Sequence, residues 1–441
     1  MTSSRPSARA LAYQILDRTE AAQSYANLTL NAYLNRSSLP PLEKKLCTRL
    51  VYGVIEKKIC LDWRISKLAS RPIESLDAEC RILLRLGLYQ LLFMDKIPAH
   101  AAVNETVALA SKRKKGLINA ILRSQMRLAD KADEWLARED PMTRLSVRTN
   151  LPVPLLELLQ KTYRDEELLD MARAFDEDPG LTLRIQTEKT DPASYLEQLK
   201  NAGLKAEPCP HSSCGIKVEQ TNPAALPGFE DGYFFVQDEA SQLCVEAVGA
   251  KSGMYVIDTC ACPGSKSFGM ALCMENTGTV LSMDLHENKL SLVKDGALRL
   301  GLDCLQIRAH DGRKPDPTLK GCADRVLCDV PCSGFGILSK KPEIRHKDVK
   351  ECGNLPSIQL QILEAGATYV KPGGSLVYST CTILPRENQE VVEAFLKRHS
   401  DFSPEPFTVG GLSSDERGML QLLPHIHRTD GFFLAKLTRT I

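Results

Sequence analysis

Two cysteines stand in motifs whose residue types suit covalent catalysis. Cys332 follows Asp329-Val-Pro, Cys381 lies between Thr380 and Thr382, and each cysteine comes just beyond an expected strand and ahead of a helix. A thiol in such a place can be exposed, and its thiolate, which is the reactive form, can be stabilised there. Burial as a structural residue suffices for most of the other thirteen of the 15 cysteines. We therefore expect these two thiols to converge on one crevice.

A loop of small residues, Cys260–Lys266, follows the apolar run Val256–Asp258 and opens a helix. Small residues let a ligand approach the backbone, and the amides of a helix N-terminus favour an anionic group. In open α/β sheets, ligands bind in this crevice at the carboxyl ends of the strands. The loop is neither Gly-x-Gly-x-x-Gly nor a Walker motif, which argues against dinucleotides and nucleoside triphosphates. An ordinary turn between a strand and a helix is the alternative interpretation.

Three aspartates follow successive expected strands. Asp284 ends the strand after the loop, about twenty residues on, where a carboxylate can accept hydrogen bonds from two ribose hydroxyls. Asp311 follows the next strand, where it could face an adenine edge, and Asp329 ends the one after. Each aspartate alone is more often a turn or cap residue. Three acceptors in succession predict a nucleoside-containing cofactor, and the lack of a phosphate cradle fits S-adenosylmethionine.

The elements that must position these residues alternate between strand and helix from Gly253 onward. Such alternation predicts βαβ units and a mostly parallel sheet with helices on both faces. Lys371–Gly374 predicts a tight turn between a helix and a strand. The expected strands are Tyr255–Asp258, Thr279–Asp284, Cys304–His310, Arg325–Asp329 and Ser375–Thr380, and the expected helices are Ser267–Glu275, Glu287–Leu300, Ser357–Val370 and Glu387–His399.

The first part of the chain, residues 5–135, reads as one helix after another, without β-alternation. Its run Ala78–Met94 is apolar nearly all round, which predicts the central helix of a bundle. Residues 1–135 carry 22 Lys and Arg against 13 Asp and Glu, a net charge of +9, whereas the remainder has a net charge of −8. This asymmetry indicates a polyanionic partner. The alternative is chance variation of the surface charge.

A basic run lies between two of these helices, where a phosphate backbone could reach it. Its residues are Lys112, Arg113, Lys114 and Lys115. We expect them to bind RNA. The alternative interpretation is a solvated helix end whose charges complement the helix dipole.

Residues 136–235 change character, because prolines interrupt the helical pattern. A small α+β connector is expected there, with helices at Leu155–Thr162 and Ala193–Ala202 and strands at Leu181–Ile185 and near Gly215–Val218. Cys209 and Cys214 lack a second pair of ligands, so we expect no zinc site and no metal cofactor. The chain is thus expected to divide into three domains, at residues 1–135, 136–235 and 236–441.

The composition of the 441 residues, 43% hydrophobic and 25% charged, is that of an ordinary globular protein. An uninterrupted apolar stretch of about 18 residues is absent, so we expect no membrane span. Met1–Arg5 leads into an amphipathic segment rather than an apolar core with a cleavage site, which argues against a secretory leader. An odd number of cysteines, scattered along a long chain, predicts reduced, cytoplasmic thiols.

Taken together, Cys260–Lys266, Asp329–Cys332 and Thr380–Cys381 resemble the motifs of the NOL1/NOP2/Sun family of RNA cytosine-C5 methyltransferases, over about residues 140–440. Residues 5–135 are similar to the NusB RNA-binding helical domain. The resemblance implies an all-α NusB-like bundle, a small α+β connector and a Rossmann-like methyltransferase domain that uses S-adenosylmethionine. This pairing of domains implies cytosine 967 of bacterial 16S ribosomal RNA as the target, with the unassembled RNA as the partner.

The resemblance also implies a role for each candidate residue. Cys381, in the Thr-Cys motif, is implied to be the nucleophile, and Cys332, in the Pro-Cys motif, is implied to assist release of the product. The carboxyl group of Asp329 suits protonation of N3 of the cytosine. The residues implied to bind the cofactor are Cys260, Ala261, Cys262, Pro263, Gly264, Ser265 and Lys266 in the loop, Asp284 at the ribose, Asp311 near the adenine and Asp329 on the methyl side.

Three positions depart from the pattern of the family. Cys262 stands where the family usually has alanine. Ser265 stands where the family usually has glycine, and if this position needs a positive φ, serine costs about 1 kcal/mol. Arg428 also stands where glycine is common.

Two other functions fit parts of the sequence, namely an antitermination-type RNA-binding factor with a decayed methyltransferase domain and a small-molecule methyltransferase. The intact Cys332, Cys381 and Asp329 argue against the first, and the basic helical domain and paired cysteines argue against the second.

Overall fold

The computed structural model describes residues 7–22, 26–220 and 222–440. Met1–Arg5, where the sequence predicts no leader, lies outside these residues. The chain forms two compact units, Met1–Asp176 with Lys340–Lys347, and Glu177–Ser339 with Asp348–Ile441. The domain boundaries after residues 135 and 235 stay our proposal. Within the described ranges, every helix is too short or too polar to cross a membrane.

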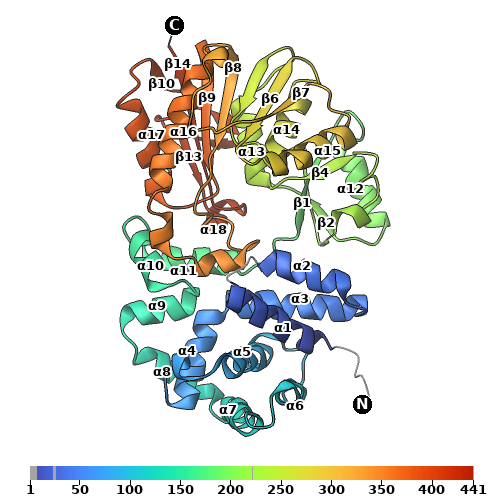
Figure 1. Ribbon diagram of the computed structural model, residues 1–441, viewed down its shortest axis with the longest axis vertical. Helices are drawn as coiled ribbons and strands as arrows, with labels where there is room; N and C mark the ends of the chain where they lie inside the picture. The colour runs from blue at the N-terminus through green and yellow to red at the C-terminus, as the bar shows by residue number, and fades with distance from the viewer. Residues whose placement is uncertain (1–6, 23–25, 221, 441) are drawn as a thin grey trace. The chain divides into compact units, whose positions relative to one another are not determined.

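The first unit consists of helices, as the sequence predicts (Figure 1). Its helix α5 (Ala78–Phe93) is buried on nearly all sides because Leu83, Leu84 and Leu88 point in different directions around it. The other elements of this unit before Asp176 are α1 (Ala8–Ala22), α2 (Ala26–Arg36), α3 (Pro41–Glu56), α4 (Lys58–Ala69), η1 (Ile73–Ser75), α6 (Ala99–Leu109), α7 (Lys115–Arg127), η2 (Ala129–Lys131), α8 (Ala132–Ala137), α9 (Pro141–Thr149), α10 (Val153–Leu159) and α11 (Asp165–Phe175).

Two prolines of the region predicted to interrupt the helical pattern lie in the first turns of helices instead. Pro141 is the first residue of α9, and Pro154 lies in the first turn of α10. Proline is well tolerated in the first helical turn, because its missing N–H would have no partner there. The helical unit therefore continues through α11 to Asp176.

One segment of the helical unit comes from far along the chain. Lys340–Lys347 follows the Pro-Cys motif in sequence but belongs to the first unit. The side chain of Arg345 in this segment is fully buried. Its guanidinium group donates hydrogen bonds to the carbonyl groups of Thr149 and Phe175 at 3.5 and 3.3 Å. It also pairs with the carboxylate of Asp176 at 3.1 Å, so the buried charge is compensated.

The expected α+β connector is present as an antiparallel sheet of four strands with one packed helix. Strand β1 pairs with β3 on one side and with β4 on the other, and β2 pairs with β3. Tyr195 and Leu199 of the helix are buried against the sheet. The elements are β1 (Leu181–Ile185), α12 (Pro192–Asn201), β2 (Ala206–Pro208), β3 (Gly215–Val218), η3 (Pro223–Ala225) and β4 (Phe234–Val236).

The second unit also holds an eight-stranded sheet (Figure 1). In the order β7, β6, β5, β8, β9 the strands are parallel. Strand β14 pairs antiparallel with β9, and β10 and β13 pair with β14. The strands are β5 (Tyr255–Asp258), β6 (Thr279–Asp284), β7 (Leu305–Ala309), β8 (Ala323–Asp329), β9 (Val370–Thr380), β10 (Phe402–Pro404), β13 (Met419–Leu422) and β14 (Phe432–Arg439).

Helices cover both faces of this sheet, as predicted. In β5, Val256 packs on one face with α13, α14 and α15, whereas Ile257 packs on the other face with α16 and α17. The remaining elements are α13 (Glu239–Val248), α14 (Ser265–Cys273), η4 (Glu287–Lys289), α15 (Leu290–Leu300), η5 (Pro317–Leu319), η6 (Pro342–His346), η7 (Val349–Cys352), α16 (Leu355–Tyr369), η8 (Pro385–Glu387), α17 (Gln389–Leu396), β11 (Thr408–Val409), β12 (Leu412–Ser413) and α18 (Pro424–His427).

The strand order reverses between β5 and β8. From β5 the chain goes to β6 and β7 on one side and then returns to β8 and β9 on the other. In sheets of this kind, the point of reversal opens a crevice outside the carboxyl ends of the strands, where ligands bind. The loop after β5 and the Asp329 motif after β8 therefore flank one crevice.

Arg428 has a φ of +56° and an exposed side chain. Left-handed backbone of this kind costs a non-glycine residue about 1 kcal/mol, because its Cβ crowds the carbonyl oxygen. We expect Arg428→Gly to raise the free energy of unfolding by about 1 kcal/mol, as measured by urea unfolding. The control is Arg428→Ala, which removes the long side chain but keeps Cβ, and which should bring no such gain. Equal stabilities of the two variants would contradict the explanation.

Candidate active site

The loop after β5 turns sharply into α14. Gly264 has a φ of +113°, and a Cβ at this position would come within 2.5 Å of the ring of Phe268. Glycine is therefore required at residue 264. Ser265 is the first residue of α14 and is not among the residues with positive φ. Ser265 would be strained only if its φ were positive. Because it is not, serine at this position does not destabilise the backbone.

A buried carboxyl group, which sequence reasoning did not single out, lies beneath this loop. Asp258 is 1% exposed. Ser267 Oγ donates a hydrogen bond to its Oδ2 at 2.7 Å, and the N–H of Cys260 lies 3.4 Å from Oδ1. Burial raises the pKa of Asp258 to about 7, although the hydrogen bond from Ser267 opposes the rise. Asp258 thus joins the end of β5 to the first turn of α14.

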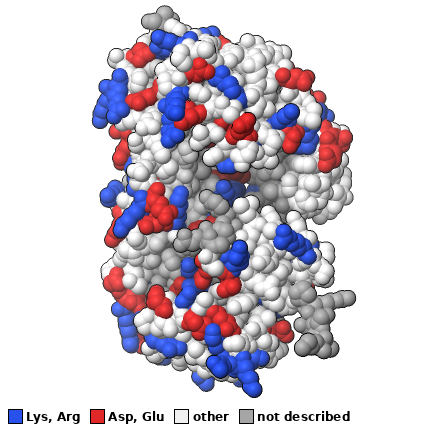
Figure 2. Space-filling model, viewed as in Figure 1, with Lys and Arg blue, Asp and Glu red and all other residues white. Residues whose placement is uncertain are grey.

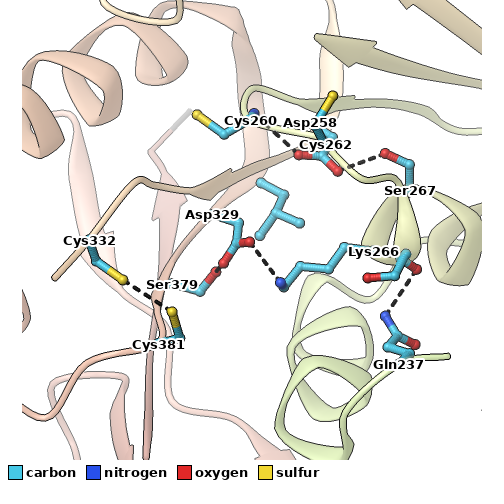
Figure 3. A network of polar contacts seen from close by, with 12 residues as sticks. Gln237, Asp258, Cys260, Cys262, Lys266, Ser267, Asp329, Cys332, Ser379 and Cys381 are labelled. Atoms are coloured by element: carbon cyan, nitrogen blue, oxygen red, sulfur yellow. Dashed lines mark hydrogen bonds and ion pairs between the residues drawn. The ribbon is translucent and has the colours of Figure 1, made fainter. Parts of the chain in front are cut away.

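Asp329, at the end of β8, is held from two sides (Figure 3). Lys266 Nζ pairs with its Oδ2 at 2.7 Å, and Ser379 Oγ donates a hydrogen bond to its Oδ1 at 2.7 Å. Burial alone would lower the pKa of Lys266, but the attraction of Asp329 outweighs it and raises this pKa. The lysine therefore stays charged. Three elements, α14, β8 and β9, meet at this carboxylate.

The two motif cysteines converge, as expected from the sequence. The Sγ atoms of Cys332 and Cys381 are 3.3 Å apart (Figure 3). The hydrogen bond with Cys381, together with burial, raises the pKa of the Cys332 thiol well above its ordinary value. Cys332 therefore keeps its proton near neutral pH and can donate it in this contact. In the contact itself either sulfur can be the donor.

Asp284 joins the end of β6 to the loop. Its Oδ2 accepts a hydrogen bond from the N–H of Cys262 at 3.1 Å, and its Oδ1 accepts one from the N–H of His286 at 2.9 Å. A carboxylate has about four acceptor positions, so both oxygens can still accept further donors. Asp284 is half-buried at the carboxyl edge of the sheet, which suits contact with a ligand's hydroxyl groups.

Asp311 follows β7 but is engaged locally. Arg313 Nε and Nη2 donate to its two carboxylate oxygens, each at 2.8 Å. This hydrogen bonding lowers the pKa of Asp311 to about 2. The structure thus places Asp311 at the expected strand end, with both oxygens already in contact with a guanidinium group.

Gln237, which lies between β4 of the connector and α13, also contacts the loop (Figure 3). Its Nε2 donates a hydrogen bond to the carbonyl of Ser265 at 3.0 Å. Gln242 in α13 donates in turn to the carbonyl of Gln237 at 2.9 Å. The connector therefore supports the first turn of α14. Nothing in the local sequence marks Gln237, because its partner is 28 residues away.

The basic run lies in the helical unit, between α6 and α7. Lys114 pairs with Asp77 and Glu79 at 2.6 and 2.9 Å, and these hydrogen bonds raise the pKa of Lys114. It therefore stabilises the start of α5. Lys112, Arg113 and Lys115 are exposed. In Figure 2, Lys and Arg side chains gather over the end of the helical unit where Figure 1 shows α7.

Comparison with known protein families gives three matches along the chain. The family described as 16S rRNA methyltransferase RsmB/F matches residues 246–438. The NusB family matches residues 6–127. The ferredoxin-like domain of the RsmF/B-like methyltransferases matches residues 151–225, which include the first three strands of the connector.

Two relatives are similar to this chain over nearly its whole length. "Probable ribosomal RNA small subunit methyltransferase B" of Bacillus subtilis (strain 168) is 36% identical, over 99% of this chain and 99% of its own. "Ribosomal RNA small subunit methyltransferase B" of Escherichia coli O127:H6 is 36% identical, over 96% of this chain and 98% of its own. The crystal structure of PH0851 has a TM-score of 0.80 at 24% identity, with 99% of each chain covered, and shows that the fold is shared.

The buried Asp258 makes the stability of the protein depend on pH. Its folded-state pKa of about 7 lies above the ordinary value near 4, so the native state holds a proton that the unfolded chain releases. The free energy of unfolding should therefore fall as the pH rises from about 4 to about 7, by about 1.4 kcal/mol per pH unit from this group, and level off above.

Asp258→Asn, which cannot ionise, should lack this decline when urea unfolding is measured between pH 5 and pH 8. The matched control is Asp295→Asn, at an exposed carboxylate of α15. It should follow the curve of the unchanged protein. A decline in Asp258→Asn parallel to that of the unchanged protein would show that Asp258 is not the titrating group.

Proposed function

Because the chain belongs to the 16S rRNA methyltransferase RsmB/F family, we propose that it methylates carbon 5 of cytosine 967 in small-subunit ribosomal RNA. The methyl donor is S-adenosylmethionine, and the protein acts in the cytoplasm on RNA that is not yet assembled. The observation that carries the proposal is the pair of thiols 3.3 Å apart, in which burial and the hydrogen bond with Cys381 raise the pKa of Cys332.

Cys381 is the nucleophile in this proposal. Carbon 5 of cytosine is a poor nucleophile, and addition of a thiolate to carbon 6 turns the ring into an enamine-like species whose carbon 5 can attack a methyl group. Cys381 is partly exposed at the carboxyl end of β9, where a base that has left its stack can reach it. Cys332, as a proton donor, is less suited to this attack.

Asp329 and Lys266 stabilise the adduct. Addition at carbon 6 makes N3 more basic, and a proton placed there stabilises the new ring. Asp329 is held by Lys266 and Ser379, so its carboxylate is fixed beside the crevice. We assign to this carboxyl group the delivery of the proton to N3: it takes a proton from solvent and passes it to N3, and it is again the carboxylate paired with Lys266 once the adduct has formed. Lys266, which stays charged, keeps Asp329 in place during the transfer.

Release of the product follows methyl transfer. Carbon 5 loses its proton to solvent, the double bond between carbons 5 and 6 re-forms as Cys381 leaves as a thiolate, and N3 gives up the proton that it had received. A hydrogen bond to the leaving sulfur makes its departure easier. The thiol of Cys332 lies 3.3 Å from that sulfur and carries the proton for such a bond, so Cys332 assists release.

The residues at the carboxyl edge of the sheet fit S-adenosylmethionine. When bound, this cofactor supplies an electrophilic methyl group on a cationic sulfur. Asp284 keeps free acceptor capacity for ribose hydroxyls, and the charge of Lys266 is balanced by Asp329, so no unpaired lysine opposes a cation. The small loop Cys260–Lys266 allows close approach. Asp311 would contact the adenine beside its partner Arg313.

The helical unit supplies RNA affinity in this proposal. Its net positive charge and the exposed Lys112, Arg113 and Lys115 suit a phosphate backbone. The NusB family matches this part of the chain. Contacts with phosphates orient an RNA without reading its sequence. In this proposal the residues around the crevice therefore select the target base.

Replacement of each cysteine tests the covalent mechanism, because Cys381 is proposed to form the covalent adduct and Cys332 to assist its breakdown. Cys381→Ala should abolish both methylation and any protein–RNA adduct. Cys332→Ala should still attack and methylate, then stall as an adduct that migrates slowly on a denaturing gel. The reverse pattern would assign the attack to Cys332. Methylation that persists in both variants without an adduct would exclude covalent catalysis.

The basic run can be tested through the salt dependence of RNA binding. Combined replacement of Lys112, Arg113 and Lys115 by alanine should reduce the slope of log K against log salt by about 2, since each phosphate contact to single-stranded RNA contributes about 0.7. Lys114→Ala is the internal control, because its charge is bound to Asp77 and Glu79, and it should leave the slope unchanged. An unchanged slope in the triple variant would refute the assignment.

A further inference from the structure

Two consecutive residues, Glu387 and Asn388, lie behind the loops that carry the cysteines. Both have no exposed surface. They stand between the Thr-Cys motif and α17, and the reaction proposed above gives them no role. A buried carboxylate is costly unless it is hydrogen-bonded, so its partners show which groups it holds.

Glu387 holds the loop of Cys332. Its Oε2 accepts a hydrogen bond from the backbone N–H of Ser333 at 2.8 Å and another from Gln359 Nε2 at 2.9 Å. The same Nε2 of Gln359 donates to the carbonyl of Pro331 at 3.0 Å. The residues on both sides of Cys332 are therefore fixed by one buried carboxylate and one buried amide.

Asn388 holds the loop of Cys381 in a similar way. Its Oδ1 accepts a hydrogen bond from Thr380 Oγ1 at 2.6 Å, and its Nδ2 donates to the carbonyl of Thr382 at 3.0 Å. Nδ2 also donates to Gln421 Oε1 at 2.8 Å, which fixes the orientation of the amide. The residues on both sides of Cys381 are thus bound to one side chain.

The two attachments cannot move independently. Glu387 and Asn388 are neighbours in the chain, so their Cα atoms stay about 3.8 Å apart across the peptide bond. The loops are also joined directly, since Ser333 Oγ and Thr382 Oγ1 are 2.8 Å apart. The spacing between the two sulfur atoms therefore depends on this pair of residues.

We propose that Glu387 and Asn388 are positioning residues that set the distance between the two thiols, Glu387 through the loop of Cys332 and Asn388 through the loop of Cys381. The inference rests on the roles proposed above for the cysteines. If Cys332 serves release and Cys381 serves attack, neighbouring residues in the chain control opposite halves of the reaction. Loss of either attachment lets one sulfur move away from the other, and a misplacement of about 1 Å can slow a step about 100-fold.

The experiment follows adduct and methylated product in a single turnover. The substrate is a transcript of the small-subunit RNA with S-adenosylmethionine, and Cys332→Ala and Cys381→Ala serve as references. Glu387→Ala should accumulate adduct as Cys332→Ala does, with release slowed about 100-fold. Asn388→Ala should form neither adduct nor product, with attack slowed about 100-fold.

Two variants separate positioning from general damage. Glu387→Gln keeps an acceptor oxygen for Ser333 and Gln359, and it should restore release. Glu390→Ala, at an exposed residue in the first turn of α17, is the matched control and should behave as the unchanged protein. Equal cofactor affinity by calorimetry shows that each variant is folded. If Glu387→Ala is not folded, Gln359→Met replaces it, because it removes the donor that holds Pro331.

If the two residues only support the fold, Glu387→Ala and Asn388→Ala should each lower the rate of attack and the rate of release together. That result would overturn the proposal. Absence of adduct in a folded Glu387→Ala, while Cys332→Ala forms it, would overturn it as well. If Cys332→Ala and Cys381→Ala do not differ from each other, the roles of the cysteines are wrong, and the failure lies in the proposed function on which the inference rests.

Discussion

The ion pair between Lys266 and Asp329 joins the two sides of the crevice, and the arrangement of the candidate site depends on it. Lys266 lies in the first turn of α14, directly after the loop that follows β5, and Asp329 immediately precedes the loop of Cys332. Both side chains are mostly buried, at 12% and 25% exposed, so each needs the other's charge. Removal of one partner from such a pair typically costs about 3–5 kcal/mol, because the other charge is left buried and unpaired. The ion pair therefore fixes the position of the loop Cys260–Lys266 relative to the loop of Cys332.

The same pair explains why two carboxyl groups can lie close to one lysine. Asp329 takes the ion pair, whereas the fully buried Asp258 has its pKa raised by burial, and the nearby Asp329 adds to the rise. A group with a pKa of about 7 is neutral for part of its time near neutral pH, and this neutrality reduces the negative charge that the interior must hold. Ser267 and Ser379 complete the hydrogen bonding of the two carboxyl groups.

Much of the fold follows from local sequence pattern. The parallel strands β5 and β6 have the predicted bounds, since each is a short apolar run that ends in an aspartate. The antiparallel strands β10, β13 and β14 are absent from the prediction, because no βα alternation marks them and β14 joins the sheet by pairing with the distant β9. The prolines that begin α9 and α10 show a second limit, because proline at a helix start and proline at a break look alike in sequence.

For the site, residue types at strand ends correctly predict that Cys332 and Cys381 meet. Sequence also gives no sign that Lys114 of the basic run pairs with Asp77 and Glu79, which are more than thirty residues away. Sequence spacing also gives no sign that Glu387 contacts Ser333, because the contact crosses 54 residues and forms only in the folded core. Hydrogen bonds of this kind depend on tertiary packing, which single-sequence pattern does not encode.

The Lys340–Lys347 segment bears on how such a chain can change during evolution. Because it belongs to the helical unit while standing inside the sequence of the other, the polypeptide passes between the units three times. Recombination that exchanged only the helices up to Asp176 would take from the fully buried Arg345 the carboxylate that compensates its charge, in a segment that follows the cysteine loop in the chain. The helical unit therefore cannot be exchanged without also changing Lys340–Lys347, and the two units are expected to be inherited together.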